Sequence, residues 1–303
     1  MAREAFVHKA FSNKSMRLIE EANLILSDYF DDGYTLTLRQ LHYQLFARAT
    51  IILGQPYENT ERSYKRLGDV LNDGRLAGLI DWDMIEDRGR QVIYPAHWNS
   101  PGDIARAAYR SFRIRRWADQ PNHVEVMVEK QALEGILSPI CEELDVRLNV
   151  NKGYSSASAM YECAQRIGEA AEDSKAVWVL YLGDHDPSGL QMTEDVERRL
   201  TLLSRYEEIT GDSIHVERLA LNIDQIKRLN LPPNPAKQSD SRFQWYADRW
   251  GEECWELDAI EPKMLVEIVR DAIENLLDRE LWNETLEREE GMRTELKEFA
   301  DRY

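Results

Sequence analysis

Cysteine is scarce in this sequence, and no stretch of it stays apolar for long. The three cysteines among 303 residues, Cys141, Cys163 and Cys254, are far apart and form no CxxC pair, which excludes a disulfide framework and a zinc site. No apolar run approaches the ~20 residues that a membrane-spanning helix needs. The first residues, MAREAFVHKAFSNKS, lack the apolar centre of a secretory signal. These absences predict a cytoplasmic protein, and an apolar fraction of 43% is enough for buried cores.

Basic residues are outnumbered, but not evenly along the chain. The sequence has 38 Lys and Arg against 55 Asp and Glu, a net charge of −17. Residues 1–120 hold 17 basic and 16 acidic residues, whereas residues 121–303 hold 21 basic and 39 acidic ones. This asymmetry predicts two modules with different tasks. DNA stays open as a partner of the first, because affinity for DNA follows local basic surface. Acidic helices that merely keep the second module soluble also explain the charge.

Three helices and then a hairpin are predicted in the first module. Apolar residues recur at helical spacing in residues 13–33, 35–51 and 59–80, and each segment carries a capping or stop signal. Residues 81–95, DWDMIEDRGRQVIYP, are typical of a short β-hairpin. This order is that of a winged helix-turn-helix, whose third helix enters the major groove of DNA. The alternative is a helical subdomain with a solvated charged face.

Basic side chains are placed to contact DNA phosphates in this arrangement. Five lie on or near the third predicted helix or at the hairpin turn, namely Arg62, Lys65, Arg66, Arg88 and Arg90. Three more recur at i, i+4 and i+7 on one face of a helix predicted over residues 101–117, namely Arg106, Arg110 and Arg113. We expect phosphate contacts from both groups. A solvated connector helix is the alternative for the second group.

After Pro121 the pattern changes to alternating strands and helices. The predicted strands are residues 123–130, 147–153, 177–184 and 214–221, and helices are predicted over residues 131–145, 155–174 and 187–211. This order predicts a mostly parallel, doubly wound sheet covered on both faces, in which ligands gather at the carboxyl ends of the strands. Residues 230–251 are rich in Pro and Asn and predict a long surface loop, and the acidic remainder predicts helices that pack on the sheet or on a second protomer.

Three acids fall at the predicted strand ends. Glu129 ends the first strand of the second module, and Asp184 and Asp186 end the third. Carboxylates gathered at one edge of a sheet repel one another unless they are neutralised, and Mg²⁺ prefers carboxylate oxygens. Gly153 ends the second strand and Ser155 and Ser156 open the next helix, whose free N–H groups suit a phosphate. The pattern favours phosphoryl or phosphodiester chemistry, although acids at helix starts are also simple caps.

Four stretches together resemble the topoisomerase VI A-subunit family, which includes the meiotic double-strand-break protein. VEKQALEGIL, NKGYSSASAM and LYLGDHDPSGLQM are similar to the Toprim domain of that family, with a Glu after one strand, a Gly-Tyr after the next and an Asp-x-Asp-Pro-x-Gly after the third. TLRQLHYQLF is similar to the Thr/Ser-x-Arg-x-x-x-Tyr helix of the family's winged-helix domain. The likeness covers most of residues 35–280 in the same order, and the size suggests a compact stand-alone relative found in bacteria and phages.

The resemblance implies a Mg²⁺-dependent enzyme that cleaves DNA by tyrosine transesterification. Glu129, Asp184 and Asp186 match the metal-binding acids, with Mn²⁺ as a substitute ion. Tyr43 matches the nucleophile, which attacks a phosphodiester and becomes linked to a 5′ phosphate, and Arg39 matches the arginine four residues earlier. A tyrosine titrates near ~10, so a neighbouring cation or base is needed to activate it. The implied partners are double-stranded DNA and a second protomer that shares composite active sites, in the nucleoid of a bacterial or phage-infected cell.

Two departures limit what the resemblance implies. Ser188 stands where a full Toprim pattern often has a third acid, so the site holds either one metal ion or two. No ATPase module is found in these 303 residues, so ATP-driven strand passage would need a separate ATP-binding B-type subunit. DNA sequence preference and biological role are open.

Other interpretations fit parts of the same pattern. The metal site of a Toprim nuclease would activate water, so that cleavage is hydrolytic, and a non-catalytic DNA-binding dimer would use the second module for assembly alone. A haloacid-dehalogenase-like phosphatase also carries a DxD, but Pro187 fits it poorly. Tyr43 would then be an ordinary half-buried packing residue. Tyr34 and Tyr64 are rival nucleophiles in the same module.

Overall fold

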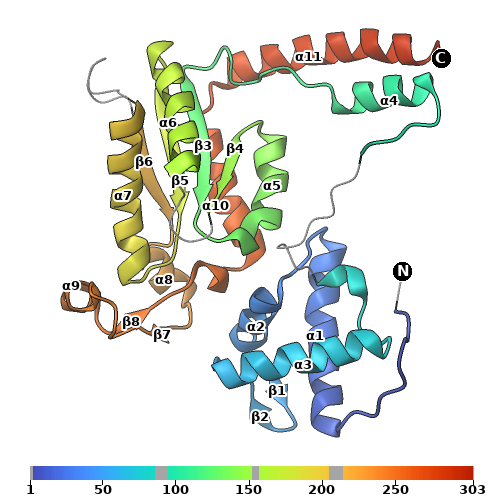
Figure 1. The fold of residues 1–303 in the computed structure, drawn as a ribbon, viewed down its shortest axis with the longest axis vertical. Helices are drawn as coiled ribbons and strands as arrows, with labels where there is room; N and C mark the ends of the chain where they lie inside the picture. Colours follow the sequence, from blue (N-terminus) through green and yellow to red (C-terminus); the bar gives the residue numbers. More distant parts are fainter. Residues whose placement is uncertain (1–2, 86–94, 152–156, 205–213, 303) are drawn as a thin grey trace.

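The computed structural model describes residues 3–85, 95–151, 157–204 and 214–302. Figure 1 shows a smaller helical part formed by α1, α2 and α3, and a larger part built around a sheet. Each part has apolar clusters of its own, because the cluster under α1–α3 draws only on residues up to Ile85 and the clusters on the sheet only on residues from Trp117 onward. Among the described residues, no helix combines the length and apolar character that crossing a membrane requires.

The helical part has the three predicted helices. α1 (Asn13–Asp31), α2 (Leu38–Ala47) and α3 (Glu61–Leu76) each begin at a hydroxyl residue that accepts a backbone N–H of the first turn. Thr37 forms a full capping box with Gln40 at the start of α2. A short antiparallel pair, β1 (Ile51–Ile52) and β2 (Gln55–Pro56), connects α2 to α3.

The predicted wing is only partly within the described residues. Trp82–Met84 form a 3₁₀ turn (η1), so the prediction of a strand there was wrong. Asp81 caps this turn by accepting the N–H of Asp83, and Arg75 holds the segment through the carbonyl groups of Trp82 and Ile85. Ile85 forms a parallel bridge with Leu36. Residues 86–94, which include the predicted turn with Arg88 and Arg90, lie outside the described residues.

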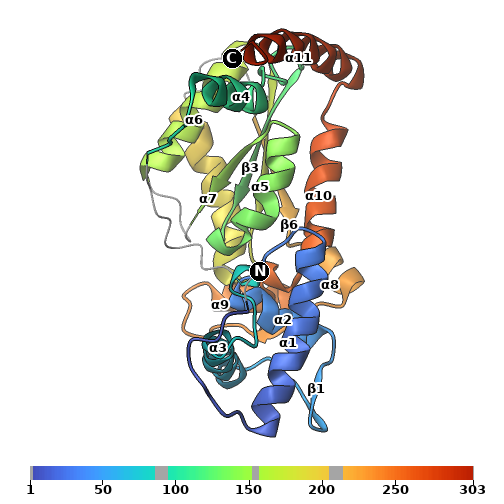
Figure 2. The ribbon, with the colours of Figure 1, turned by 90° about the vertical axis from the view of Figure 1, so that its right-hand side faces the viewer.

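The arginine-rich helix is shorter than predicted. α4 (Pro101–Ser111) ends at Ser111, where the backbone of Phe112 becomes extended and the Ser111 hydroxyl bonds back to the carbonyl groups of Ala107 and Ala108, so the helix predicted over residues 101–117 was wrong beyond Ser111. α4 packs along α11 (Arg279–Ala300), and both views place this pair at the end of the molecule farthest from α1–α3 (Figures 1 and 2).

The predicted α/β fold is confirmed for the second half of the chain. Four parallel strands pair in the order β4-β3-β5-β6, namely β3 (Asn122–Val128), β4 (Arg147–Val150), β5 (Ala176–Leu182) and β6 (Ile214–Ala220). α6 (Ala157–Glu172) and α7 (Pro187–Ser204) cover one face of the sheet. α5 (Glu134–Glu143) and α10 (Pro262–Asn275) cover the other, as Figure 2 shows. Burial on both faces explains the near-continuous apolar strands.

The segment after β6 returns to the sheet edge that carries the acids. It contains α8 (Ile223–Leu229), an antiparallel pair of β7 (Asn234–Pro235) and β8 (Glu253–Cys254), α9 (Phe243–Trp250) and the 3₁₀ turn η4 (Leu257–Ala259). The prediction of a long loop over residues 230–251 was therefore wrong. Tyr246 of α9 is fully buried, and its hydroxyl donates to the carbonyl group of His185 or Glu253, which binds this segment to the DxD turn.

Candidate active site

Glu129 and Asp184 meet because β3 and β5 end side by side. Val128 and Leu182 are register partners, so the residues that follow them leave the sheet together. The N–H of Glu129 donates to the carbonyl of Leu182 at 2.9 Å, and the N–H of Asp184 donates to Oε2 of Glu129 at 3.2 Å. Both side chains are buried, with Glu129 9% and Asp184 8% exposed. The structure thus brings together two of the three predicted metal ligands.

Two glycines allow the turn to pass this close to the acids. A Cβ at Gly183 would lie 2.7 Å from Oε2 of Glu129, and one at Gly189 would collide with the backbone oxygen of Asp184. Asp186, the third predicted ligand, accepts the N–H of Gly189 at 2.6 Å and so caps the start of α7. The DxDPxG pattern is therefore needed for the turn itself, whatever the acids bind.

Burial and mutual repulsion make the charged forms of Glu129 and Asp184 unfavourable. Burial raises the pKa of Glu129 to about 7, and the charges of Asp184 and Asp186 add to the effect. Burial also raises the pKa of Asp184 to about 6, although Lys130 and the N–H of Leu257 act in the opposite direction. A cation placed among these carboxylates would lower both pKa values.

Lys130 is a cation that the chain itself supplies at this edge. Its Nζ lies 3.0 Å from Asp184 Oδ1, 2.8 Å from Glu256 Oε2 and 3.0 Å from Asp258 Oδ2. Burial alone would lower the pKa of Lys130, but these three carboxylates outweigh it and hold the pKa well above the usual value. Glu256 and Asp258 belong to the segment around η4, which the bridge between His185 and Trp255 attaches to the DxD turn.

The carboxylates fit a hard divalent cation by their chemistry. All the donors are carboxylate oxygens, which Mg²⁺ prefers, and Oδ1 of the fully buried Asp258 has no hydrogen-bond partner in the described part of the chain. Across the same residues, no three His, Cys, Asp or Glu side chains are arranged at metal-binding spacing in this conformation. Lys130 already engages Asp184, and the N–H of Gly189 already engages Asp186, so both must yield some of their present contacts to a metal.

α2 brings Arg39 and Tyr43 to the same acidic segment. Nη1 of Arg39 donates to Glu256 Oε2 at 2.9 Å, and its side chain is 46% exposed. Tyr43 is 3% exposed, and its hydroxyl accepts from Nδ2 of Asn234 at 3.2 Å. Burial raises the pKa of Tyr43, and the neighbouring charge of Glu256 raises it further. Two motifs far apart in sequence therefore converge on one carboxylate.

The surroundings of Tyr43 form a polar network that extends from the helical part to Asn234 of β7. His42 contacts Tyr57 through Nδ1 at 2.7 Å and Asn59 through Nε2 at 3.0 Å, and Asn59 donates to Asn234 at 2.9 Å. Tyr64 is one of the two alternative nucleophiles. The guanidinium carbon of Arg39 lies over its ring, 5.5 Å from the centre of the Tyr64 ring. The other rival, Tyr34, packs against the apolar cluster of α1–α3.

The predicted DNA-contacting residues lie in separate places. Arg62 and Lys65 are exposed on α3, where Lys65 pairs with Glu61 at 2.7 Å, and Arg66 is partly buried there. Arg106 pairs with Asp103 on α4, and Arg110 is exposed on the same helix. Arg113 lies beyond the helix end and donates to the carbonyl of Glu142. Arg88, Arg90, Gly153, Ser155 and Ser156 lie outside the described residues.

Sequence reasoning missed four charged residues of the site, namely Lys130, Arg218, Glu256 and Asp258. Arg218 of β6 is partly buried, and its guanidinium donates to the backbone oxygens of Gly183, Asp184 and Gly189. β6 also contains His215 and Glu217, so a charged residue at this position gives no clear signal in the sequence. Lys130 directly follows Glu129, but nothing in the sequence places Glu256 and Asp258 beside it.

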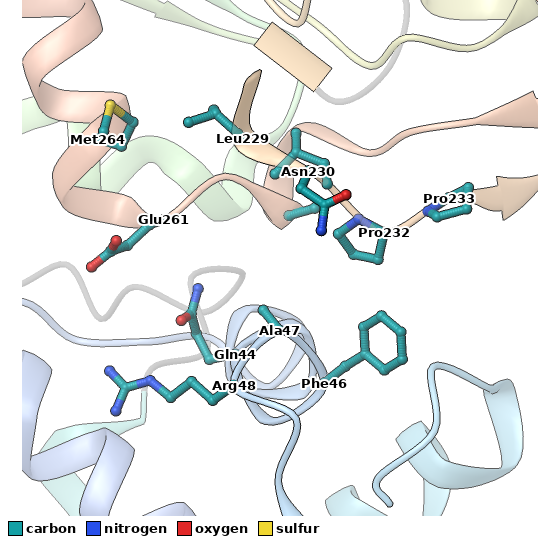
Figure 3. Close-up of a pocket in the computed structure, with 12 residues that line it drawn as sticks. Gln44, Phe46, Ala47, Arg48, Leu229, Asn230, Pro232, Pro233, Glu261 and Met264 are labelled. Atoms are coloured by element: carbon teal, nitrogen blue, oxygen red, sulfur yellow. The ribbon is translucent and has the colours of Figure 1, made fainter. Parts of the chain in front are cut away.

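A cavity of about 590 Å³ adjoins the contact between α2 and the larger part. Figure 3 shows Phe46, Ala47 and Arg48 of α2 on one side, and Pro232, Pro233 and Met264 on the other. The two parts thus touch through the polar groups around Glu256 and leave open space next to them.

The arrangement combines a tyrosine hydroxyl, two cations and a set of buried and partly buried carboxylates at one sheet edge. Those groups are suited to bind and attack a phosphate ester. A scan against protein-family models, a search of curated proteins and a search of solved structures each found no match to this chain.

Proposed function

We propose that this protein is a Mg²⁺-dependent DNA-cleaving enzyme that acts by tyrosine transesterification, similar to the topoisomerase VI A subunit. One observation carries the proposal: Tyr43 and Arg39 of α2 lie at the same carboxylate, Glu256, that Lys130 joins to Asp184. Chance packing of two unrelated modules gives no reason for the predicted nucleophile to meet the predicted acids. The α/β sheet and its acid-bearing edge are compatible with a Toprim domain, and the helical part with a winged helix.

In this proposal each residue has a separate task. The hydroxyl oxygen of Tyr43 attacks the phosphorus, and the 3′ oxygen of the DNA leaves, so that the 5′ phosphate stays on the tyrosine. Arg39 lies one helical turn before Tyr43 and stabilises the phenolate. Mg²⁺ held by Glu129, Asp184 and Asp186 would stabilise negative charge on the phosphate. Arg218 keeps the DxD turn in shape through the backbone.

DNA and a second protomer are the proposed partners. The basic residues of α3 would contact phosphates of the duplex, and the family resemblance implies a homodimer in which Tyr43 of one protomer serves the acids of the other. Tyr43 here lies beside Glu256 of its own chain. Exchange between protomers therefore requires the contact between α2 and the η4 segment to open. Strand passage would require a separate ATP-binding subunit.

The test is to trap a covalent intermediate on supercoiled plasmid with Mg²⁺ or Mn²⁺. SDS followed by protease should reveal breaks with protein attached to the 5′ ends. Tyr43→Phe should abolish the adduct, while Tyr64→Phe, the matched change on α3, should retain it. An adduct that persists in Tyr43→Phe contradicts the assignment of the nucleophile.

A hydrolytic Toprim nuclease is the second candidate, and one observation favours it. Tyr43 is 3% exposed with its hydroxyl engaged by Asn234, as expected of a packing residue. In that case Tyr43→Phe cleaves normally, no protein remains on the DNA, and Glu129→Gln and Asp184→Asn are inactive. If the Asp184→Asn, Asp186→Asn double variant binds DNA and retains full biological activity, the protein is a non-catalytic DNA-binding dimer.

A further inference from the structure

Three groups from distant parts of the sequence converge on the carboxylate of Glu256. Nη1 of Arg39 lies 2.9 Å from Oε2 and 3.3 Å from Oε1 of Glu256. Nζ of Lys130 lies 2.8 Å from the same Oε2. The hydroxyl of Tyr43 adjoins this carboxylate as well. The Glu256 carboxylate, which has one negative charge and two oxygens, is thus held by Arg39 and Lys130 and lies next to the Tyr43 hydroxyl.

A phosphodiester has the same charge and also presents two non-bridging oxygens. Arg binds carboxylate and phosphate through the same planar donors, and Lys binds either one as a point charge. We propose that Glu256 occupies the position of the scissile phosphate, and that Lys130 is a second phosphate-binding residue beside Arg39. This inference rests on the proposed function, because it places the phosphate next to the proposed nucleophile.

The contact that Glu256 makes is built so that it can open. Its side chain is 24% exposed, and that of Arg39 is 46% exposed. The described apolar clusters of the two parts share no residue, so separating them around Glu256 exposes no continuous core. A cavity of about 590 Å³ lies beside α2 and is lined by Ala259 and Glu261 of the segment that follows Glu256 (Figure 3). The contact with Arg39 is the more exposed of the two ion pairs of Glu256, and exposed ion pairs contribute little to stability and are exchanged at low cost.

Lys130 keeps its place when the side chain of Glu256 alone turns away. Asp258 still holds its Nζ at 3.0 Å, and Asp184 does so at 3.0 Å until a metal takes one of its oxygens. The ammonium therefore stays at the sheet edge and gains a free donor for a phosphate oxygen. Arg39 stays one helical turn from Tyr43, so a phosphate in the place of Glu256 lies between the cations and the nucleophile.

The experiment measures DNA binding without cleavage. A fluorescein-labelled DNA duplex is titrated with protein in the Tyr43→Phe background at fixed Mg²⁺, and anisotropy gives the dissociation constant. Adding Glu256→Gln frees both cations and should tighten binding roughly 5-fold or more, the range in which such coupling is usually found. Glu252→Gln is the matched control, because it removes one exposed negative charge from the same segment and should have a much smaller effect.

A second pair of variants tests the two cations. Adding Lys130→Met or Arg39→Met to Glu256→Gln should each remove the gain in affinity. Arg39→Met is the safer of the two, since Arg39 is half exposed and its loss leaves the carboxylates around Lys130 in place. Circular dichroism melts verify that each variant is folded. The proposal is overturned if Glu256→Gln binds no tighter than Glu252→Gln, or if the gain survives in a folded Arg39→Met variant.

Failure here and failure of the proposed function give different results. A gain with Glu256→Gln but no covalent adduct supports the phosphate site and overturns the transesterase; plasmid cleavage without an adduct would then assign cleavage to water. An adduct through Tyr43 without that gain retains the transesterase and overturns the role given to Glu256 and Lys130.

Discussion

Glu125 lies within β3 and Glu129 directly follows that strand, four residues later, but the surroundings of the two carboxylates differ completely. Glu125 is fully buried and accepts two hydrogen bonds from Arg166, at 3.0 and 2.9 Å, and one from Asn149 at 2.8 Å. Burial alone would raise the pKa of Glu125, but His123, Arg166 and Asn149 outweigh it and lower the pKa to about 2. Glu125 is thus a charge that the fold has satisfied.

Glu129 directly follows the last residue of β3, and its charge has few compensating partners. Its carboxylate accepts the N–H of Asp184, and its charged neighbours Asp184 and Asp186 carry the same sign. The pKa of Glu129, about 7, is therefore far above the pKa of Glu125, about 2, although the two residues are only four positions apart. A buried carboxylate with a full set of partners serves the fold, whereas one left among like charges marks a place for a ligand.

The first prediction removes the satisfied charge. Glu125→Gln leaves Arg166, whose side chain is 27% exposed, without its counter-ion, so the free energy of unfolding should fall by about 1.5–3 kcal/mol. Urea denaturation followed by circular dichroism measures this change. Glu129→Gln is the matched control and should cost far less, because it removes repulsion. Equal losses in the free energy of unfolding of the two variants would show that the two carboxylates contribute alike to folding.

A double variant sharpens this result. Glu125→Gln combined with Arg166→Met removes both charges, and it should recover a large part of the lost stability because no unpaired buried charge is left. If the double variant is as unstable as the single one, the pair matters through packing instead of charge.

The second prediction removes the unsatisfied charge and measures activity. Glu129→Gln should lower the rate of Mg²⁺-dependent plasmid cleavage on the order of 10²- to 10³-fold, because a ligand for the cation is lost. The exposed Glu142→Gln on α5 should cleave like the unchanged protein. Full activity of Glu129→Gln would remove Glu129 from the site and leave its raised pKa without a function.

The strands and the meeting of two acids could be predicted from the sequence because both depend on local patterns. Apolar runs predict β3 and β5, and parallel strands end at one edge, so Glu129 and Asp184 could be expected at the same edge; the pairing of β3 with β5 then makes them neighbours. Thr37 is likewise a capping residue that indicates where α2 starts. Once the helix is placed, its periodicity puts Arg39 and Tyr43 on one face. Whether that face meets the acids is a matter of tertiary packing.

The remaining parts of the site depend on contacts that local patterns do not record. Glu256 and Asp258 reach Lys130 only because Tyr246 and Trp255 fasten a distant segment to the DxD turn. The Pro- and Asn-rich composition of that segment predicted a loop and hid α9. Glu125 and Glu129 look alike in HVEVMVEK, and only the position of Arg166 separates them.

The third prediction uses pH without divalent cations. The raised pKa of Glu129 means that the folded state holds a proton more tightly than the unfolded chain, so this contribution to stability is full below the usual value of 4.5 and is lost as pH rises through about 7. Asp184 acts in the same direction up to about 6. The free energy of unfolding should therefore decline between pH 4.5 and 7, by at most about 3 kcal/mol for Glu129.

The two glutamates respond to pH in opposite directions. Glu125 has a lowered pKa, so its contribution is present above 4.5 and is lost as pH falls through about 2. Glu129→Gln should flatten the decline between pH 4.5 and 7 and leave the acid limb unchanged. An unaltered profile in Glu129→Gln would show that the decline comes from other groups.

The fourth prediction concerns a divalent cation that binds beside Glu129. Such a cation should offset the repulsion among the acids there and have no effect on Glu125. Mg²⁺ that binds only the folded protein stabilises it by about 2.7 kcal/mol at one hundred times its dissociation constant. Thermal melts at pH 7, with K⁺ at matched ionic strength as the reference, should show a rise in melting temperature that is absent from Glu129→Gln and Asp184→Asn. Glu125→Gln melts lower but should keep the same Mg²⁺-induced rise, because its carboxylate is remote from the cation. A rise of equal size in Glu129→Gln would place the cation elsewhere on this acidic chain.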